Sequence, residues 1–267
     1  MRPLAELPDE EARAIGIVLF DLDDTVLTHG RLTREAYGAI CDLADAGLDL
    51  VAVTGRPAGW GEIIARQWPV LAVVAENGAA ILRREHGGVA RLVQDPTAKV
   101  RLAPLVSAVL GAFPDVELAD DNAARLTDVA FDIGERRKLP RERVEALRAF
   151  VLGQGARATM SSVHLHASFE GDDKASGALR VLLLLRRLDA GAARARAVFV
   201  GDSENDAACF ACFRTTVGVA NVAPWVGRLT VPPRYVTEAP MGAGFAQLAR
   251  RLLSARSGAG TAEAVRT

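Results

Sequence analysis

Three carboxylates follow directly after a short apolar run near the N-terminus. Within the segment VLFDLDDTVL, residues 18–27, aliphatic and aromatic side chains give way to Asp21, Asp23 and Asp24. Carboxylates so close together repel one another, which costs free energy unless a cation neutralises them. Mg²⁺ suits this task because it prefers oxygen ligands and binds one or two carboxylates together with a substrate phosphate. We expect Asp24 to serve only as a cap or turn residue.

Three further polar groups stand where other predicted elements begin or end. Thr54 ends the apolar segment LDLVAVT, Asp202 ends AVFVGD, and Lys174 begins the helix expected before that strand. Each of them alone is as easily a helix cap or a turn residue. The carboxyl ends of parallel strands share one edge of a sheet, and ligand sites lie there. Their convergence with Asp21 and Asp23 therefore favours a functional site.

This combination of groups is typical of phosphoryl transfer. A threonine hydroxyl, backbone N–H groups and a lysine ammonium suit phosphate oxygens, and the transferring group needs its charge stabilised. A carboxylate can act as the nucleophile and form an aspartyl-phosphate. A second carboxylate two residues along the chain can act as general acid and then as general base.

The elements that would position these groups alternate between strands and helices. Short, β-branched segments bounded by turn residues predict buried strands at 16–20, 48–54, 70–77, 197–202 and 215–220. Helical spacing predicts helices at 33–46, 58–66, 174–188, from about 205, and at 243–254. The first of these has Thr33 as a candidate N-cap and Gly47 just beyond its end. The alternation predicts an α/β fold, with a Rossmann-like parallel sheet covered on both faces.

Residues 84–167 follow a different pattern, which predicts an inserted α+β domain. Its expected strands and helices are strands at 89–94, 126–133, 156–162 and 163–168, and helices at 98–112 and 140–152. Polar linkers flank it near 83–88 and 169–173. The predicted organisation is a core of residues 1–83 and 168–255, the inserted domain at 84–167, and a flexible tail at 256–267.

The composition excludes several classes of protein. The 267 residues carry a net charge of −1 and half of them are hydrophobic, so nothing in the charge suggests binding to nucleic acid or to an anionic membrane. No apolar stretch is long enough to span a bilayer. Three cysteines are too few for a disulfide framework, and the N-terminal segment is too acidic for a secretory signal. We expect a cytoplasmic protein; its oligomeric state is left open.

The motifs DLDDT, TGR, an isolated lysine and GDSEND occur in this order between residues 21 and 206. As a set they resemble the signature motifs of the haloacid dehalogenase superfamily, in its phosphatase branch. The resemblance implies that Asp21 is the nucleophile and that Asp23 protonates the leaving alkoxide and then activates water. It also implies that Thr54, with Gly55 beside it, binds phosphate and that Lys174 orients the nucleophile and the phosphate. The presence of Asp23 disfavours dehalogenation.

The same resemblance implies Mg²⁺ as cofactor. Its ligands would be the carboxylates of Asp21 and Asp202 and the backbone carbonyl of Asp23. Asn205 and Asp206 would support the metal, directly or through water.

The position of the inserted domain narrows the resemblance. It lies between the Thr54 and Lys174 motifs, and the segment AENGA, residues 75–79, precedes it. This is similar to subfamily IIB, whose members carry a large α/β cap domain. The subfamily includes Cof-type phosphatases, sucrose-phosphate, trehalose-phosphate and mannosyl-3-phosphoglycerate phosphatases, and phosphomannomutases. Asn77 and Gly78 are expected near the hinge and the substrate, although a plain tight turn explains the pair equally well.

Three other residues are candidate substrate contacts. Arg56 either touches the substrate or its phosphate, or caps a helix or pairs with an acid. His164 and His166 occupy alternate positions of a predicted strand, with Ser161 or Ser162 beside them. The two histidines face either the substrate cleft or solvent, and we slightly favour solvent. They lack a third partner at metal-ligand spacing, so no zinc site is expected.

We therefore expect a Mg²⁺-dependent phosphatase acting on a small-molecule phosphate ester. A sugar phosphate is the favoured substrate, hydrolysed through an aspartyl-phosphate while the cap closes over it. The alternatives are a phosphomutase of the same fold and a non-catalytic ligand-binding protein. The second alternative is disfavoured because binding alone does not require a nucleophile.

Overall fold

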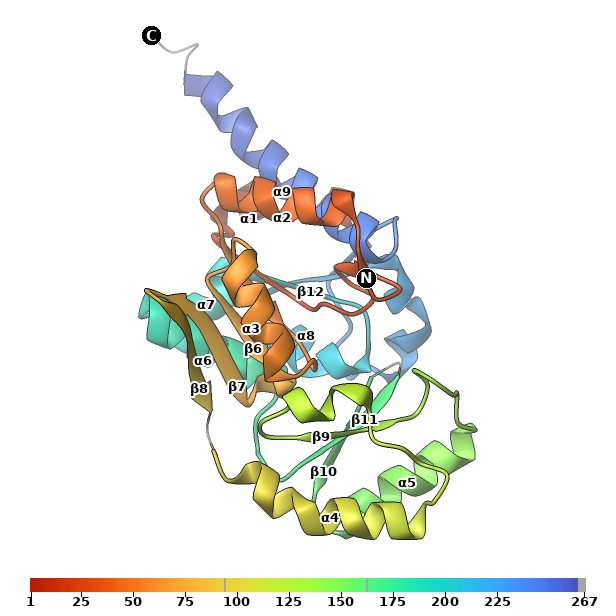
Figure 1. Cartoon of the computed structure of the whole chain (residues 1–267). Coiled ribbons are helices and arrows are strands. Elements are labelled where there is room, and N and C mark those ends of the chain that lie inside the picture. The colour runs from red at the N-terminus through yellow and green to blue at the C-terminus, as the bar shows by residue number, and fades with distance from the viewer. Residues whose placement is uncertain (94, 162, 264–267) are drawn as a thin grey trace.

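In the computed structural model, which describes residues 1–93, 95–161 and 163–263, nine strands form one central sheet (Figure 1). In spatial order they are β1 (Arg2–Pro3), β14 (Tyr235–Val236), β13 (Thr215–Gly218), β12 (Ala197–Gly201), β2 (Ile17–Phe20), β5 (Asp49–Val53), β6 (Ala72–Ala75), β7 (Ala80–Glu85) and β8 (Gly88–Val93). Neighbouring strands from β1 to β6 are parallel, whereas β7 and β8 are antiparallel. The predicted parallel sheet is confirmed, and an antiparallel hairpin extends one of its edges.

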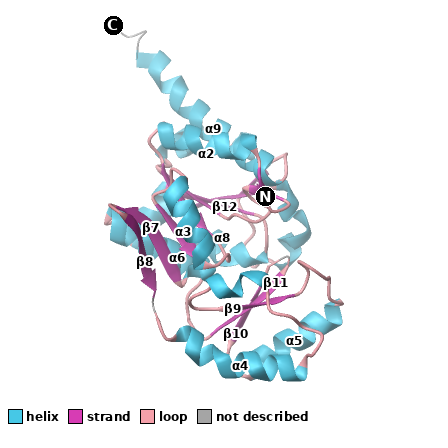
Figure 2. Ribbon diagram, in the orientation of Figure 1, coloured by secondary structure: helices cyan, strands magenta, loops and turns pink. Residues whose placement is uncertain are grey.

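Helices cover both faces of this sheet (Figure 2). One face is covered by α1 (Asp9–Ala14), α2 (Arg34–Asp45), α3 (Ala58–Gln67) and α9 (Met241–Glu263). The other is covered by α6 (Lys174–Arg186), α7 (Ala190–Arg196) and α8 (Ala207–Cys212). Each face has its own apolar cluster because successive side chains of a strand point to opposite sides. In β2, Val18 and Phe20 join the first cluster, and Ile17 and Leu19 join the second.

Short elements complete the core. A two-stranded ribbon of β3 (Leu27–Thr28) and β4 (Arg31–Leu32) follows β2. The short 3₁₀ helices are η1 (Leu4–Glu6), η2 (Glu76–Gly78), η3 (Asp120–Ala124), η4 (Glu204–Asp206) and η5 (Ala220–Arg228). Thr33 caps α2 as expected, because its hydroxyl accepts a hydrogen bond from the N–H of Ala36.

The inserted domain lies below the core in Figure 1 and has a separate apolar cluster. Its antiparallel sheet has the order β10 (Arg157–Met160), β11 (His164–Ser168) and β9 (Val129–Asp132), and it packs against α4 (Ala98–Ala112) and α5 (Arg141–Gly153). The structure differs from the prediction at the start of this domain. Residues 88–93 were expected in it, but β8 pairs with β7 in the central sheet. The physical reason is that Val89 and Val93 pack against the apolar cluster of the core.

The last helix also differs from the prediction. It was expected to end at 254, with a tail from 256, but α9 extends to Glu263. Ala255 is buried, and the Arg256 guanidinium donates hydrogen bonds to the carbonyls of Ala12 and Leu252. These contacts hold this part of α9 against α1. Residues 264–267 of the expected tail lie outside the described residues. Neither α9 nor any other described helix combines the length and apolarity needed to cross a membrane.

Helix α6 approaches the turn after β6 at very short range. A β-carbon added to Gly177 would lie 2.6 Å from the Cα of Gly78 and 2.6 Å from a methyl carbon of Val74. Gly78 itself has φ +110°, and a β-carbon there would lie 2.1 Å from the carbonyl oxygen of Asp173. These two glycines allow the first turn of α6, which carries Lys174, to lie directly against the end of the sheet.

We predict that Gly177→Ala lowers the free energy of unfolding by about 1–3 kcal/mol, because the added methyl group overpacks a closed contact. The matched control is Gly38→Ala on α2, where an added β-carbon meets no atom within 4 Å. That change should leave stability unchanged or raise it by up to about 1 kcal/mol, because alanine is the better helix former. Urea denaturation of both variants measures the difference, and equal effects would contradict the close approach.

Candidate active site

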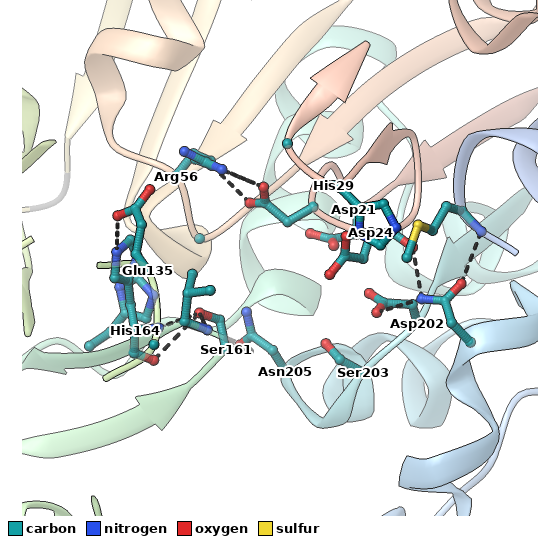
Figure 3. A pocket seen from close by; sticks show the side chains of 18 of the residues that line it. Asp21, Asp24, His29, Arg56, Glu135, Ser161, His164, Asp202, Ser203 and Asn205 are labelled. Carbon is teal, nitrogen blue, oxygen red and sulfur yellow. Dashed lines mark hydrogen bonds and ion pairs between the residues drawn. The ribbon is translucent and has the colours of Figure 1, made fainter. Parts of the chain in front are cut away.

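The carboxyl ends of the parallel strands form one wall of a cavity of about 460 Å³, and the inserted domain forms the other. Figure 3 shows Asp21, Asp24 and Asp202 on one side and Glu135 and His164 on the other. The lining residues of the core are Asp21, Asp23, Asp24, His29, Gly30, Gly55, Arg56, Asp202, Ser203, Asn205, Asn221, Trp225 and Met241. Those of the inserted domain are Arg125, Gly134, Glu135, Ser161, Val163, His164 and His166.

A buried ammonium group joins two carboxylates behind the core wall, and of the three residues only Asp21 lines the cavity itself. The Nζ atom of Lys174 lies 2.7 Å from Oδ1 of Asp21 and 2.7 Å from Oδ1 of Asp206. All three side chains are buried. Burial alone would lower the pKa of Lys174, but the two carboxylates raise it above its ordinary value, so the ammonium stays charged. The second oxygen of Asp206 accepts hydrogen bonds from the N–H groups of Asp202 and Ser203, which shapes the turn after β12.

One lysine does not neutralise all the acids of this wall. Burial raises the pKa of Asp21 to about 7, and Lys174 only partly counteracts it. Burial, together with the charges of Asp206 and Asp21, raises the pKa of Asp202 to about 9. Asp21, Asp202 and Asp206 each offer a carboxylate oxygen, and these oxygens lie within 4.8 Å of one another. A set of hard oxygen ligands with unbalanced negative charge suits a divalent cation such as Mg²⁺.

Two residues that the sequence analysis missed orient Asp202. The hydroxyl of Thr25 donates to Oδ1 at 3.2 Å, and Nδ2 of Asn221 donates to Oδ2 at 3.0 Å. Asn221 is fixed in turn, because its Oδ1 accepts a hydrogen bond from the N–H of Met241. Asn221 follows β13 at the same sheet edge, so the rule that located Thr54 could have located it.

The carboxylate of Asp23 is held by Arg56. The Nε atom of Arg56 lies 3.1 and 2.9 Å from the two oxygens of Asp23, and Nη2 lies 2.6 Å from Oδ1. The guanidinium stacks over the ring of Trp60, with its carbon 4.4 Å from the centroid. Among the alternatives for Arg56, pairing with an acid is the one found here. The pair places Asp23 at the cavity wall in a defined orientation.

Two predicted substrate contacts do not line the cavity. Thr54 is fully buried, and its hydroxyl accepts a hydrogen bond from the N–H of Arg56 at 3.0 Å. The side chain of Asn77 accepts a hydrogen bond from Nδ2 of Asn205 at 3.1 Å. Gly55 and Asn205 do line the cavity. The roles of Thr54 and Asn77 toward a substrate stay predictions.

The preference for solvent-facing histidines is wrong. His164 and His166 are each 4% exposed, and both line the cavity. Both lie on β11, the central strand of the smaller sheet. Leu165, between them in the sequence, points to the opposite face and joins the apolar cluster that packs against the helices. The alternation of β11 therefore turns both imidazoles toward the core. Ser161 lines the cavity beside them, and Ser162 lies outside the described residues.

Each histidine has a carboxylate partner. Nε2 of His164 lies 2.8 Å from an oxygen of Glu135, and Nδ1 of His166 lies 3.1 Å from an oxygen of Asp128. Burial lowers the pKa of His166, which favours the neutral imidazole although Asp128 opposes the shift. Arg125 lies 3.3 Å from the same Nδ1. Arg125 and Glu135 carry no local sequence signal, because only the fold of the inserted domain brings their loops to the cavity.

Comparisons with known proteins agree with this architecture. The family model of haloacid dehalogenase-like hydrolases matches residues 18–107. A phosphoglycolate phosphatase of Pyrobaculum aerophilum is 29% identical over 245 residues, covering 90% of this chain and 97% of the relative. The resemblance inferred from the motifs is confirmed.

Two solved structures share the fold. A haloacid dehalogenase-like hydrolase from Bacteroides thetaiotaomicron has a TM-score of 0.67 at 14% identity, covering 89% of this chain and 99% of its own. The sucrose-phosphatase of Synechocystis, in complex with sucrose and phosphate, has a TM-score of 0.65 at 15% identity, covering 90% and 98%.

We predict that Lys174→Met destabilises the metal-free protein by about 3–5 kcal/mol near pH 8, because it leaves buried carboxylates unpaired. The folded-state pKa of Asp21, about 7, lies above the ordinary value near 3.9. Lowering the pH from about 8 to about 6 therefore protonates Asp21 in the folded protein and removes the charge that Lys174 stabilises.

The deficit should accordingly be smaller at the lower pH. Chemical denaturation in excess chelator at both pH values measures it, with exposed Lys138→Met as the control variant. A deficit that does not change with pH would contradict the assigned electrostatics.

Proposed function

We propose that this chain, a phosphatase of the haloacid dehalogenase superfamily, depends on Mg²⁺ and hydrolyses a small phosphorylated metabolite of the sugar phosphate class through an aspartyl-phosphate. The observation that carries the proposal is the pair of Asp21 and Asp202 at the wall of a cavity shared by two domains, with the buried Lys174 and Asp206 in contact behind them. Two similar proteins, a phosphoglycolate phosphatase and a sucrose-phosphatase, support a small phosphorylated metabolite as the substrate, and only the second of them favours the sugar phosphate class.

In the first half-reaction, an oxygen of Asp21 attacks the phosphorus atom and the bond to the leaving alkoxide breaks. Asp23, as a carboxylic acid, gives its proton to that alkoxide. Lys174 favours the ionised form of Asp21 and orients it, because its ammonium lies 2.7 Å from one oxygen of the nucleophile. The product bound to the enzyme is the aspartyl-phosphate of Asp21.

In the second half-reaction, the Asp23 carboxylate takes a proton from a water molecule as that water attacks the phosphorus atom. The bond to Asp21 breaks, and inorganic phosphate and the free carboxylate result. Arg56 would hold Asp23 at the cavity wall through both steps.

The carboxylates of Asp21, Asp202 and Asp206 would hold the metal, with Asn205 nearby in support and the Asp23 backbone carbonyl as a further oxygen. When bound, Mg²⁺ neutralises charge on the phosphoryl group. Thr25 and Asn221 would prepare the site by fixing the Asp202 carboxylate.

The inserted domain would recognise the leaving group. Its wall of the cavity combines imidazole, hydroxyl and carboxylate groups on His164, Ser161 and Glu135, a mixture of donors and acceptors that suits a hydroxyl-rich molecule. The loop of Glu135 is held in place by Asp132, whose carboxylate accepts three backbone N–H hydrogen bonds from residues 134–136. The cavity volume falls in the range of about 300–1,000 Å³ typical of small-molecule sites.

A phosphomutase would use the same nucleophile and return the phosphoryl group to a second hydroxyl. Release of inorganic phosphate without a bisphosphate activator separates the two functions. We infer a cytoplasmic location, which the three free cysteines Cys41, Cys209 and Cys212 support.

We predict metal-dependent release of inorganic phosphate from at least one hexose or disaccharide phosphate. A colorimetric screen over sugar phosphates, phosphoglycolate, phosphoglycerate derivatives and nucleotides, with Mg²⁺ and with chelator, measures it. Activity that survives thorough chelation would overturn the proposed metal dependence. Phosphate release confined to phosphoglycolate would overturn the sugar phosphate class while leaving the phosphatase intact.

We predict that Asp21→Asn lowers kcat by at least about a thousandfold, because the amide oxygen is a poor nucleophile. Circular dichroism should show the same fold, and Asp45→Asn at an exposed position of α2 serves as the matched control. Steady-state phosphate release measures both variants. Full activity of Asp21→Asn would show that another group attacks phosphorus.

A further inference from the structure

Glu76 is a buried carboxylate that the proposed reaction does not use. It follows β6 directly and is 2% exposed. Its φ is +50°, that of Asn77 is +53° and that of Gly78 is +110°, so three consecutive residues adopt left-handed conformations. Such conformations cost free energy in residues other than glycine and persist only where surrounding contacts enforce them.

The contacts of Glu76 join the two domains. Its Oε1 accepts hydrogen bonds from the N–H of Ala58, the first residue of α3, at 2.9 Å and from that of Leu126 at 2.8 Å. Its Oε2 accepts from the N–H and from the hydroxyl of Thr127, both at 2.6 Å. Leu126 and Thr127 belong to the inserted domain, just before β9. One core carboxylate thus satisfies three donors of the inserted domain and the N-terminus of a core helix.

Neighbouring residues continue this contact on both sides. The guanidinium of Arg125 donates from Nη1 to the carbonyl oxygen of Gly55 at 3.1 Å. A β-carbon on Gly59 would lie 2.8 Å from that of Ala124, so α3 and the inserted domain touch without intervening side chains. We call these contacts, between residues 55–59 with Glu76 and residues 124–127, the docking seam.

The docking seam adjoins the reaction cavity. Gly55 and Arg56 line the cavity from the core, and Arg125 and His166 line it from the inserted domain. The chain connects the domains only after β8 and before α6, and two such connections leave the relative orientation adjustable. A displacement at the docking seam would therefore move the cavity wall that carries His166 relative to Asp23. Asp23 would stay with the core, because Arg56 holds it there.

We propose that Glu76 is a positioning residue that docks the inserted domain on the core and so fixes the separation between the leaving-group wall and the nucleophile. Its catalytic consequence rests on the proposed function, whereas the docking itself does not. Glu76 acts through hydrogen bonds to Leu126 and Thr127 and touches no reacting atom.

Amide hydrogen exchange of the full chain tests the docking without any substrate. In Glu76→Gln, one of the two oxygens becomes an NH₂ group that cannot accept these bonds. Exchange at the Leu126 and Thr127 amides should then accelerate by about tenfold or more, while the amides of Phe131 and Leu165 within the smaller sheet keep their rates. Glu85→Gln, at an exposed glutamate of the core, is the matched control and should change neither.

Two outcomes of this experiment would overturn the proposal. Unchanged exchange at Leu126 and Thr127 would show that Glu76 does not hold the seam. Equal acceleration at Phe131 and Leu165 would show that the substitution loosens the inserted domain itself and not its docking.

Thr127 supplies a kinetic test with an internal rescue. Thr127→Val keeps the shape of the side chain but lacks the hydroxyl that donates a hydrogen bond to Glu76. Thr127→Ser retains that hydroxyl. With glucose 6-phosphate, Thr127→Val should raise KM about tenfold with kcat within about twofold, while Thr127→Ser behaves as the unaltered protein. Equal KM values for the two variants would overturn the proposal. If the unaltered protein releases no phosphate from this ester, glucose 6-phosphate is not a substrate, and the exchange rates still decide the docking.

Discussion

The catalytic end of the sheet depends on one buried ion-pair cluster, in which the Lys174 ammonium joins Asp21 and Asp206. The three residues come from the first turn of α6, the end of β2 and the 3₁₀ helix after β12, so the cluster links three elements distant in sequence. Separating buried charges from their partners costs several kcal/mol, and this cost keeps the three elements together. The close approach of Gly177 to Gly78 is the steric condition that allows Lys174 to reach this position.

The single lysine of the cluster does not neutralise all the neighbouring carboxylates, and this excess of negative charge is what suits the site to the proposed cation. Burial raises the pKa values of Asp21 and Asp202 because neither has a full counter-charge within the protein. A cation at the three clustered carboxylates would relieve that repulsion and also neutralise an incoming phosphate. Asp23 is different, because Arg56 supplies its counter-charge directly. Two acids two residues apart thus have different electrostatic surroundings.

The wall of the cavity that the inserted domain forms differs from the acidic core wall. It carries histidines paired to carboxylates and a loop held by Asp132. In the proposed mechanism, chemistry and recognition would therefore reside in separate domains, and the reaction would depend on how accurately these are docked. The backbone strain at Glu76 and Asn77, of order 1–3 kcal/mol for each such residue, is placed where this docking occurs. The carboxylate of Glu76 offsets it by accepting hydrogen bonds from both domains.

Local pattern was enough to predict the α/β core, the strand ends that carry Asp21, Asp23 and Asp202, and the helix start at Lys174. Each of these depends on short-range periodicity and on the rule that parallel strands end at one edge of the sheet. Tertiary structure alone decided that Arg56 pairs with Asp23, that His164 and His166 face the cavity, and that β8 belongs to the core. It alone placed Arg125 and Glu135 at the cavity and Glu76 in the docking seam. The physical reason is that most of these features depend on contacts between segments far apart in the chain, within the core for Arg56 with Asp23 and between the two domains for Glu76 with Thr127. The strand-end motifs are instead set by neighbours along the chain.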